Sequence, residues 1–414
     1  MKRLVQRVEY LNFLKRHRDK PIIKVVSGVR RSGKSTLFTL YRHYLEADGV
    51  AAENIVNINF EDMQFNELRD ANALYAYLIT KIQNKEKVYV FLDEIQHVHQ
   101  FERVVDSLFI KENVDLYITG SNAYYLSGEI ATLLSGRYVE LQMLPLSFAE
   151  FLEWHIQNDP NKQTNNDYFN EYLKSAMPYT LFTDSDQETL EYLNGVYNTV
   201  VLNDIVARLN ISDVRVLQRL IETLFSTIGG LVTINKLRNT LVSKGAQIAN
   251  KTVEKYIRGI LDSLIMYEAK RFDIHGKELL ETQEKYYIVD VGLRRLTLRD
   301  HLEDFGHILE NIVFLELKRR GYEVYVGKIG TYEVDFVAIN SKQELSYYQV
   351  ALNTTDRNVL ERELRPLQSI KDSYPKYLLT LDDFNKEANY DGIKKLGVID
   401  WLLGQHSSLS ENMS

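Results

Sequence analysis

The sequence predicts an α/β protein of several domains that begins with a parallel β-sheet. Over the first third of the chain, short β-rich apolar runs alternate with helical patterns, which is typical of a parallel sheet covered by helices. Three helical patterns and two strand-like runs follow between Ser212 and Asp290, and a further α/β pattern begins near Gly306. The length of 414 residues exceeds what one hydrophobic core usually organises, which favours two to four domains.

The N-terminal part contains about five strand-like runs. They are continuous apolar stretches, as expected for parallel strands that are buried on both faces. They lie at residues 22–27, 54–60, 88–93, 116–120 and 138–144, with helical patterns at 34–45, 67–82 and 101–110. Together they predict a first domain over residues 1–155.

The remaining chain divides into four predicted segments. A helical, aromatic linker or lid is expected over 156–210, and a polar interruption at 158–167 marks its beginning. Three helices followed by a hairpin over 211–295 is the order of a winged helix-turn-helix. A helix, three strands and a further helix predict another α/β domain over 296–405, and residues 406–414 are expected to form a frayed tail.

Composition excludes several classes of protein. The chain has no cysteine, which rules out disulfides, thiolate metal sites and cysteine nucleophiles and agrees with a reducing cytosol. No stretch approaches 18 uninterrupted apolar residues, so we expect a cytoplasmic protein with no membrane span. The net charge is −7, yet residues 1–48 are strongly basic. A basic block can attract phosphates or nucleic acid, although many such blocks are ordinary solvated faces.

The run from Gly28 to Ser35 matches the P-loop or Walker A pattern G-x-x-x-x-G-K-[ST], and it lies between a strand and a helix. Its glycines let successive backbone N–H groups face phosphates at the helix N-terminus. Lys34 would reach the β and γ phosphates, and Ser35 would bind Mg²⁺. The residues predicted to bind ATP are Gly28, Val29, Arg30, Arg31, Ser32, Gly33, Lys34, Ser35 and Thr36.

The apolar strand at 88–92 ends in the carboxylates Asp93 and Glu94, as a Walker B segment requires. Asp93 would hold Mg²⁺, usually through water, and Glu94 would polarise the attacking water as a general base. Two solvated acids at a strand end are the plain alternative. The pairing with the P-loop favours the functional interpretation and indicates ATP hydrolysis as well as binding.

Two further residues are candidates for catalysis. Asn122 follows another apolar strand and could contact the γ-phosphate or the lytic water, although a structural turn explains it nearly as well. Arg137 precedes the last strand of the first domain and could act as an arginine finger, in the same chain or from a neighbouring subunit. An ordinary surface ion pair is the alternative for Arg137.

Several segments together resemble a widespread bacterial and archaeal family, the AAA-type ATP-binding proteins with a conserved, uncharacterised C-terminal domain. They are GVRRSGKSTL, FLDEIQHV, ITGSNAYYLS, LSGRYVELQMLPLSFAEF, YEVDFVA and YYQVA. The resemblance covers nearly the whole chain. It implies a P-loop NTPase core with an additional-strand parallel sheet, a winged helix and a C-terminal domain similar to restriction endonucleases, and it says little of biological role.

In an endonuclease-like fold, the resemblance maps the metal-binding acids onto Glu310 and Asp335. The pair that should follow departs from the pattern, because Gln349 replaces a charged ligand and Ala351 replaces the lysine that stabilises the transition state. Substitutes for these groups could come from Glu333, Glu316 or Arg362. A retained fold used for docking or for binding nucleic acid is the preferred interpretation.

The predicted winged-helix segment is basic, and Lys251, Lys255 and Arg258 fall on one face of its third helix while Leu261 and Ile265 would pack inward. DNA is therefore a candidate partner, and a solvated helix is an equal alternative.

The leading hypothesis is an ATPase that repositions its other domains, with a homo-oligomer as a candidate assembly. The competing hypotheses are a nucleic-acid-binding switch with little turnover, an ATP-regulated nuclease and, more weakly, a small-molecule kinase.

Overall fold

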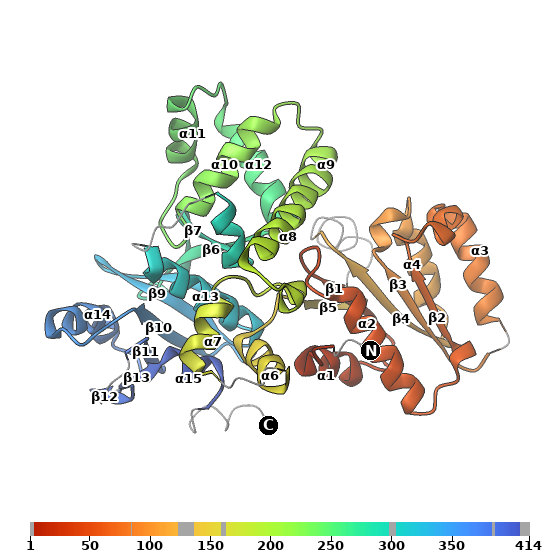
Figure 1. Cartoon of the computed structure of the whole chain (residues 1–414), viewed down its shortest axis with the longest axis horizontal. Helices are drawn as coiled ribbons and strands as arrows, with labels where there is room; N and C mark the ends of the chain where they lie inside the picture. The colour runs from red at the N-terminus through yellow and green to blue at the C-terminus, as the bar shows by residue number, and fades with distance from the viewer. Residues whose placement is uncertain are drawn as a thin grey trace. The chain divides into compact units, whose positions relative to one another are not determined.

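The computed structural model describes residues 4–83, 85–122, 136–158, 163–297, 304–382 and 386–405. The chain forms two compact units, of which the first comprises Met1–Pro145 with Asp262–Leu264. The second comprises Leu146–Leu261 and Ile265–Ser414. Figure 1 shows the first unit in red to orange and the second in yellow to blue. The predicted tail at 406–414 lies outside the described residues.

A five-stranded parallel sheet forms the centre of the first unit. Its strands are β1 (Ile23–Ser27), β2 (Ile55–Asn59), β3 (Val88–Asp93), β4 (Val114–Gly120) and β5 (Tyr138–Gln142). They lie in the order β2-β3-β4-β1-β5, and every pair is parallel. The extra strand β4 therefore separates β1 from β3, and the predicted parallel sheet is confirmed.

Helices cover both faces of this sheet, which explains why its strands are apolar throughout. They are α1 (Val8–Arg16), α2 (Lys34–Ala47), α3 (Ala71–Ile82) and α4 (Phe101–Phe109). The apolar sides of α3 and α4 pack with one set of strand residues, and those of α1 and α2 pack with the other. Local capping fixes where α3 begins, because the Asp70 carboxylate accepts hydrogen bonds from the N–H groups of Asn72 and Ala73.

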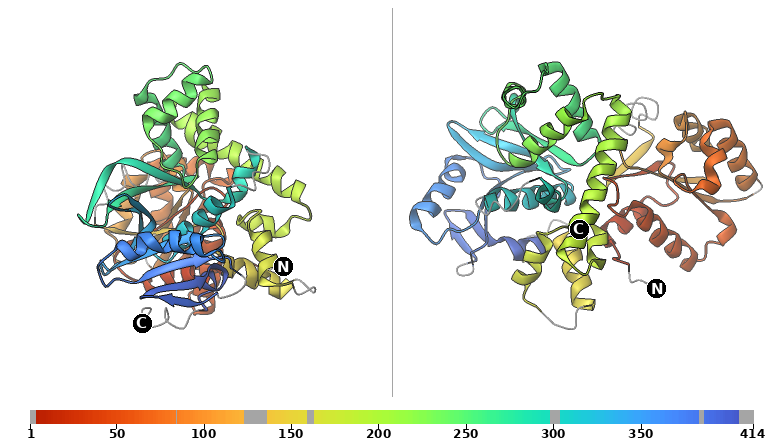
Figure 2. Two further views of the ribbon diagram at one scale, coloured as in Figure 1. Left: turned by 90° about the vertical axis from the view of Figure 1, so that its left-hand side faces the viewer. Right: turned by 45° about the horizontal axis from the view of Figure 1, so that its top comes forward.

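The second unit begins with helices. They are α6 (Phe148–Asn158), α7 (Asn165–Tyr172), α8 (Asp186–Thr199), α9 (Ala207–Leu209), α10 (Val214–Ser226), α11 (Ile234–Ser243) and α12 (Asn250–Asp262). A π-helical turn over Val200–Val206 joins α8 to α9, and the right-hand view of Figure 2 shows them as one long yellow-green helix. None of the helices that the structure describes is both long enough and apolar enough to cross a membrane.

An eight-stranded mixed sheet forms the centre of the second unit. Its strands are β6 (Met266–Asp273), β7 (Glu278–Ile288), β8 (Glu323–Ile329), β9 (Tyr332–Ile339), β10 (Leu345–Ala351), β11 (Lys376–Thr380), β12 (Ala388–Tyr390) and β13 (Ile393–Gly397). Their order is β12-β13-β11-β10-β9-β8-β6-β7. Three helices accompany the strands, namely α13 (Phe305–Arg319), α14 (Arg357–Ser369) and α15 (Val398–Leu402).

The structure divides the chain differently from the sequence. The hairpin β6–β7 belongs to the large sheet, because β6 pairs in parallel with β8 through Arg271 opposite Val326. A free edge of β6 would expose unpaired N–H and C=O groups, and β8 covers that edge. The predicted boundary between 295 and 296 therefore falls within one sheet. The first unit also ends ten residues before the predicted limit at 155, at Pro145.

Candidate functional site

The loop between β1 and α2 has the geometry of a phosphate cradle. Gly28 allows a close approach of two backbones, because a Cβ at this position would lie 2.4 Å from the carbonyl oxygen of Met143. Gly33 has φ 103° and ψ 17° directly before α2. Both positions therefore require glycine, and the free N–H groups at the start of α2 provide an anion site.

Lys34 is buried at the start of α2. Its Nζ donates to the carbonyl oxygen of Gly28 at 3.0 Å and lies 3.2 Å from Oε1 of Glu94. The ammonium is thus held by its own loop and by a carboxylate at the end of β3. Backbone carbonyls are modest partners for a cation, so phosphate oxygens would compete well for Lys34.

Asp93 and Ser35 lie together beneath the loop. The carboxylate of Asp93 accepts hydrogen bonds from the hydroxyls of Thr119 and Ser35. Burial raises the pKa of Asp93 above its ordinary value, and these two hydrogen bonds offset part of the rise. A hydroxyl beside a carboxylate supplies the oxygen ligands that Mg²⁺ prefers. The donor set therefore fits the metal role predicted for Ser35 and Asp93.

Glu94 has a left-handed backbone, with φ 55° and ψ 50°, and its N–H donates to Oγ1 of Thr119 at 2.8 Å. Its Oε2 accepts a hydrogen bond of 2.5 Å from the amide of Gln96. Burial alone would raise the pKa of Glu94, but the charge of Lys34, followed by the Gln96 hydrogen bond, lowers it to about 2. Asp93 and Glu94 are neighbours with oppositely shifted pKa values, as expected when two acids have different roles.

Gln96 is a site residue without a predicted role. It lies in a short 3₁₀ turn (Ile95–His97), and its amide donates both to Glu94 and to Oγ of Ser121, 3.2 Å away at the tip of β4. Asn122 follows Ser121 and is also buried. The structure therefore brings Asn122 to the same sheet edge as Asp93 and Glu94. The DEIQ segment is part of the family resemblance, but a glutamine two residues after paired acids carries no chemical signal of its own.

The structure separates Arg137 from this edge. Its carbonyl oxygen accepts from the N–H of Ile23, so it lies where β1 begins, at the opposite end of that strand from the P-loop. Its guanidinium pairs with Asp106 on α4. Arg137 does not approach the P-loop of its own first unit, and a role toward a neighbouring subunit stays a prediction.

The variable residues of the loop differ in exposure. Val29 and Ser32 are fully buried, whereas Arg31 is exposed. Arg30 donates to Glu61 at 2.9 Å. Glu61, Glu94 and His97 also offer ligand atoms within 4.8 Å of one another. Since Arg30 and Lys34 already compensate the two carboxylates, this group does not need a metal for charge balance.

A second polar cluster lies in the second unit, around Glu310 on α13. Its Oε1 accepts from Nζ of Lys285 at 2.9 Å and from the hydroxyl of Tyr287 at 2.5 Å. Lys285 also pairs with Glu333 at 2.8 Å. Asp335 accepts from the N–H of Val350 at 2.8 Å. A buried lysine from β7 thus lies beside acids from α13 and β9, and the sequence assigned it no part.

Charge in this second cluster is unbalanced. Removal from water, followed by the charge of Glu310, raises the pKa of Asp335 well above its ordinary value. Burial alone would lower the pKa of Lys285, but Glu310, Asp335 and Glu333 together raise it. Lys285 therefore pairs with two carboxylates, Glu310 and Glu333, and lies near a third, Asp335, while His307 lies 3.5 Å from the other oxygen of Glu310.

The other residues considered for this cluster lie elsewhere. Glu316 pairs with Arg319 and Arg320 on its own helix. The guanidinium of Arg362 is largely exposed and pairs with Glu363, which in turn accepts from the Gln349 amide at 3.0 Å. Glu316 therefore does not supply the acid that Gln349 replaces, and Arg362 does not supply the cation that Ala351 lacks.

Comparison with known proteins identifies the first unit. Residues 20–152 match the family model described as "AAA domain", and residues 165–302 match a domain of unknown function, DUF8612. An uncharacterised protein of Haemophilus influenzae is 41% identical over 406 residues, which cover 97% of this chain and 99% of that protein. The chain belongs to a family of AAA-type P-loop proteins. An uncharacterised archaeal member, MJ1544 of Methanocaldococcus jannaschii, is 30% identical over 91% of this chain and 85% of its own length.

One solved structure supports the fold of this AAA-type family. The Walker-type ATPase PABY2304 of Pyrococcus abyssi aligns with a TM-score of 0.50 at 15% sequence identity, over 70% of this chain and 95% of that chain. At this level of identity the likeness concerns the fold alone. The mixed α/β architecture with a parallel P-loop sheet is therefore shared, and the residue roles rest on the geometry above.

In this member of the family, α12 presents a basic face. Lys251, Lys255 and Arg258 are exposed, whereas Val253 and Ile257 are buried on the other side. Lys255 donates to the carbonyl oxygen of Leu209 at 3.0 Å. A single bridge between Val232 and Glu284 ties the segment between α10 and α11 to the hairpin.

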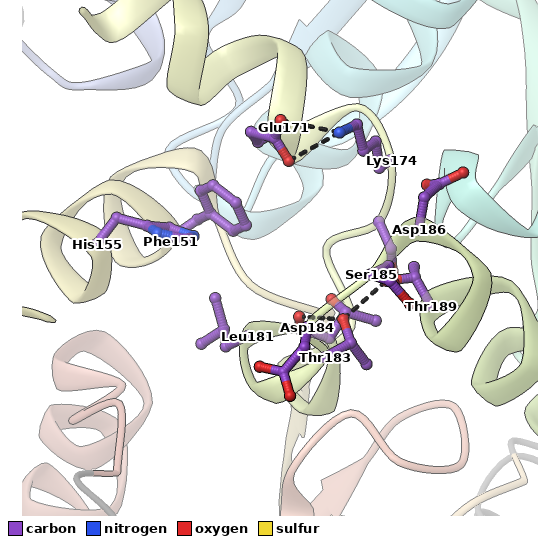
Figure 3. A pocket seen from close by; sticks show the side chains of 12 residues that line it. Phe151, His155, Glu171, Lys174, Leu181, Thr183, Asp184, Ser185, Asp186 and Thr189 are labelled. Carbon is purple, nitrogen blue, oxygen red and sulfur yellow. Dashed lines mark hydrogen bonds and ion pairs between the residues drawn. The ribbon is translucent and has the colours of Figure 1, made fainter. Parts of the chain in front are cut away.

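A cavity of about 220 Å³ lies in the second unit among α6, α7 and α8 (Figure 3). Among the described residues that line it, Lys174 is paired with Glu171 at 2.8 Å, Asp186 is paired with Arg295 at 2.6 Å, and Asp184 adds a further carboxylate. The hydroxyls of Thr183 and Thr189 bond to each other at 2.7 Å. The lysine and the carboxylates described in this lining are thus largely paired or negatively charged, which is unlike a nucleotide site.

Proposed function

We propose that this protein is a Mg²⁺-dependent ATPase that converts ATP to ADP and phosphate. The observation that carries the proposal is the meeting of Lys34, the Ser35–Asp93 pair and Glu94 at one edge of the parallel sheet. The backbone from Gly28 to Thr36 would hold the phosphates. Mg²⁺ supplies neutralising charge when it is held by Ser35 and, through water, by Asp93.

Glu94 is the proposed general base. A carboxylate with a pKa of about 2 is a weak base, because efficient catalysis requires a pKa nearer the working pH. Phosphates that attract Lys34 would remove the charge that lowers this pKa, while burial, which raises it, remains. Binding of ATP would therefore raise the pKa of Glu94 and make it a stronger base toward the water that attacks the γ-phosphate. Asn122 is proposed to contact the γ-phosphate or the attacking water.

Phosphate release by the purified full-length protein tests the proposal. We expect turnover that requires Mg²⁺ and falls by about 10²–10³-fold in Glu94→Gln, within the range that a general base contributes. Glu112→Gln is the matched control, because Glu112 is exposed and lies just before β4, at the far edge of the sheet. Equal turnover in the two variants would exclude Glu94 as the base. Transfer of phosphate to a metabolite instead of water would indicate a kinase.

We also propose that α10–α12 and the β6–β7 hairpin act as a winged helix-turn-helix that contacts DNA. The exposed Lys251, Lys255 and Arg258 support this, as does the Val232–Glu284 bridge between the helices and the hairpin. Contacts to phosphates release counterions, so binding should weaken as salt increases. A triple Lys251→Gln, Lys255→Gln, Arg258→Gln variant should lose affinity and salt dependence. Unchanged DNA binding by this variant would exclude α12.

A second candidate activity is metal-dependent cleavage of nucleic acid by the cluster around Glu310. Lys285 favours it, because it supplies the buried cation that Ala351 lacks and lies 2.9 Å from Glu310. The surplus of carboxylates also fits a divalent cation on charge grounds. Cleavage of plasmid DNA with Mg²⁺ or Mn²⁺, abolished by Asp335→Asn and by Lys285→Met, would support the activity. Absence of cleavage with either metal would exclude it and leave a docking role.

A further inference from the structure

Arg7, just before α1, is a buried cation next to the P-loop. Its side chain is almost fully enclosed, and its backbone has φ 48° and ψ 51°, in the left-handed region. Residues other than glycine enter this region at a conformational cost, so the surrounding contacts must hold Arg7 there. The contacts of its guanidinium show what it holds.

The guanidinium of Arg7 joins two backbone segments. It donates to the carbonyl oxygen of Ser32 in the P-loop at 3.2 Å, and to those of Leu144 and Pro145 at 2.7 and 3.3 Å. It also lies over the ring of Tyr10, 4.7 Å from its centroid. The Tyr10 hydroxyl accepts from the N–H of Leu144 at 3.2 Å. A planar fork of N–H groups can hold carbonyls in a fixed relation, which a lysine cannot do.

The second of these segments, Met143–Leu146, is the connector along which the chain first passes from the first unit into the second; the chain crosses between the units again on either side of Asp262–Leu264. At its start, the N–H of Met143 donates to the carbonyl oxygen of Ser27 at 2.7 Å. Its last residue, Leu146, belongs to the second unit, where its N–H donates to Ala176 at 2.8 Å and its carbonyl oxygen accepts from Tyr172 at 3.0 Å. The connector is thus hydrogen-bonded at one end to the last residue of β1 and, through Arg7, to Ser32 of the P-loop, and at the other end to residues of the second unit.

The peptide plane between Ser32 and Gly33 explains how a phosphate would move this network. The carbonyl oxygen of Ser32 and the N–H of Gly33 belong to one rigid plane. When that N–H turns toward a phosphate, the carbonyl oxygen must turn with it, and the Arg7 guanidinium is bound to that oxygen.

We propose that Arg7 couples the nucleotide state of the P-loop to the connector. A change at Ser32 is passed through the guanidinium to Leu144 and Pro145, and from there along the chain into the second unit. This inference rests on the proposed function, because it needs a nucleotide in the P-loop. It names Arg7 as a positioning residue that does not itself touch the phosphates.

Hydrogen exchange of the nucleotide-free, full-length protein tests the physical link. Arg7→Lys keeps the charge and removes the fork, so amide exchange should rise at least threefold both in residues 28–36 and in residues 141–148. Arg16→Lys is the control, because Arg16 lies on the exposed side of α1. A rise in one segment alone, or in neither, would overturn the proposal. This readout needs no nucleotide and stands even if the ATPase proposal fails.

Intrinsic fluorescence tests the coupling itself. Both tryptophans, Trp154 on α6 and Trp401 on α15, belong to the second unit. A non-hydrolysable ATP analogue with Mg²⁺ should change the emission, and Trp154→Phe should remove this change. In Arg7→Lys the amplitude should fall by at least half at saturating analogue, with binding followed separately through a fluorescent analogue.

Four outcomes separate the two proposals. A full signal in Arg7→Lys, or no signal in the wild type with analogue bound, would overturn the coupling and leave the ATPase intact. Absence of analogue binding to the wild type would overturn the proposed function, and the exchange experiment would then decide the link alone. A halved signal together with raised exchange in both segments supports Arg7 as the coupling residue.

Discussion

The two units each contain a buried lysine paired with a buried glutamate, and the two pairs differ in what surrounds them. Lys34 and Glu94 have side-chain exposures of 3% and 7%, and Lys285 and Glu310 have 4% and 8%. Lys34 otherwise donates to two carbonyl oxygens of its own loop, those of Gly28 and Val29, whereas Lys285 has a second carboxylate partner, Glu333. A phosphate that enters the loop can therefore draw the Lys34 ammonium away from Glu94. Lys285, in contrast, is needed to compensate the carboxylates of Glu310 and Glu333.

The pKa values of Glu94 and Asp335 differ in the same way as the surroundings of the two lysines. Burial alone would raise the pKa of Glu94, but Lys34, Gln96 and Arg30 together lower it to about 2, which favours the charged carboxylate. Asp335 shares one lysine with Glu310 and Glu333, and its pKa is raised. The first site pairs one lysine with one glutamate, whereas the second gathers three carboxylates around Lys285, with His307 beside Glu310, and so favours a proton or a cation near Asp335.

The largest expected effect is on the stability of the second unit. Lys285→Ala leaves Glu310 and Glu333 without their buried cation, which should lower the free energy of unfolding by about 3–5 kcal/mol. Urea denaturation followed by tryptophan fluorescence measures this, since both tryptophans lie in that unit. Lys270→Ala, at an exposed position of β6, is the control. If the two alanine variants unfold at the same urea concentration, Lys285 does not hold the cluster.

The next effect concerns pH, and the two units should respond with opposite signs. Burial raises the pKa of Asp290 from 3.8 to about 6, despite hydrogen bonds from Ala176 and Ser175. Its contribution to stability is present below pH 3.8 and is lost as pH rises through about 6, a loss of about 3 kcal/mol. Asp290→Asn should flatten the stability of the second unit between pH 4 and pH 7. The exposed Asp184→Asn should leave that slope in place.

Glu94 provides the contrast in the first unit. Because its pKa is lowered from 4.5 to about 2, its contribution is present above pH 4.5 and is lost as pH falls through about 2. Glu94→Gln should therefore flatten the acid side of the stability profile. Hydrogen exchange of residues 88–98 between pH 2.5 and pH 5 measures it after correction for the intrinsic pH dependence of exchange. The same slope in variant and wild type would contradict the assigned ion pair.

A smaller effect is expected from the residue that orients Glu94. Gln96→Leu removes the hydrogen bond to Oε2 but leaves Lys34 in place, so kcat should fall about tenfold, equal to about 1.4 kcal/mol. The acid limb of the kcat/KM profile should also move to higher pH, because this hydrogen bond lowers the pKa of Glu94. Ser121→Ala, which removes only the second partner of Gln96, should change kcat by less than threefold. A drop in kcat without a shifted limb would indicate general damage to the loop.

The smallest effect is expected at Arg137. Because this residue lies where β1 begins and pairs with Asp106, Arg137→Ala should change turnover by less than twofold in dilute protein. Turnover per molecule measured over a range of protein concentrations checks this. A loss that grows with concentration would show that Arg137 serves the site of a neighbouring subunit.

The predictability of the two sites follows from how local each one is. The P-loop is a continuous run, and Asp93 with Glu94 ends the strand at 88–93, so both are visible as letters in order. Parallel strands place their carboxyl ends at one edge, which is why Asn122, after β4, lies at the same edge as Asp93 and Glu94, while its role toward a phosphate stays a prediction. Arg137 lies before a strand rather than after one, and that places it at the other edge.

Other parts depended on contacts between distant segments. Arg7 reaches Leu144 and Pro145 across more than a hundred residues, and no spacing rule connects them. The sequence does not predict a role for Lys285, because the pattern assigns its strand, β7, to a separate winged helix. The pairing of β6 with β8 brings this hairpin into the large sheet, and no local pattern predicts that pairing. The helices could be predicted from the sequence more readily, because amphipathic patterns and N-terminal caps such as Asp70 are local signals.

The pairing of β6 with β8 also decides how the protein can be cut into fragments. A truncation after residue 295 would leave β6 with a bare edge of N–H and C=O groups, and such edges promote aggregation. A cut between Pro145 and Leu146 would leave both sheets whole. Fragments that are cut between Pro145 and Leu146 should therefore stay in solution at concentrations where a fragment that ends at residue 295 precipitates.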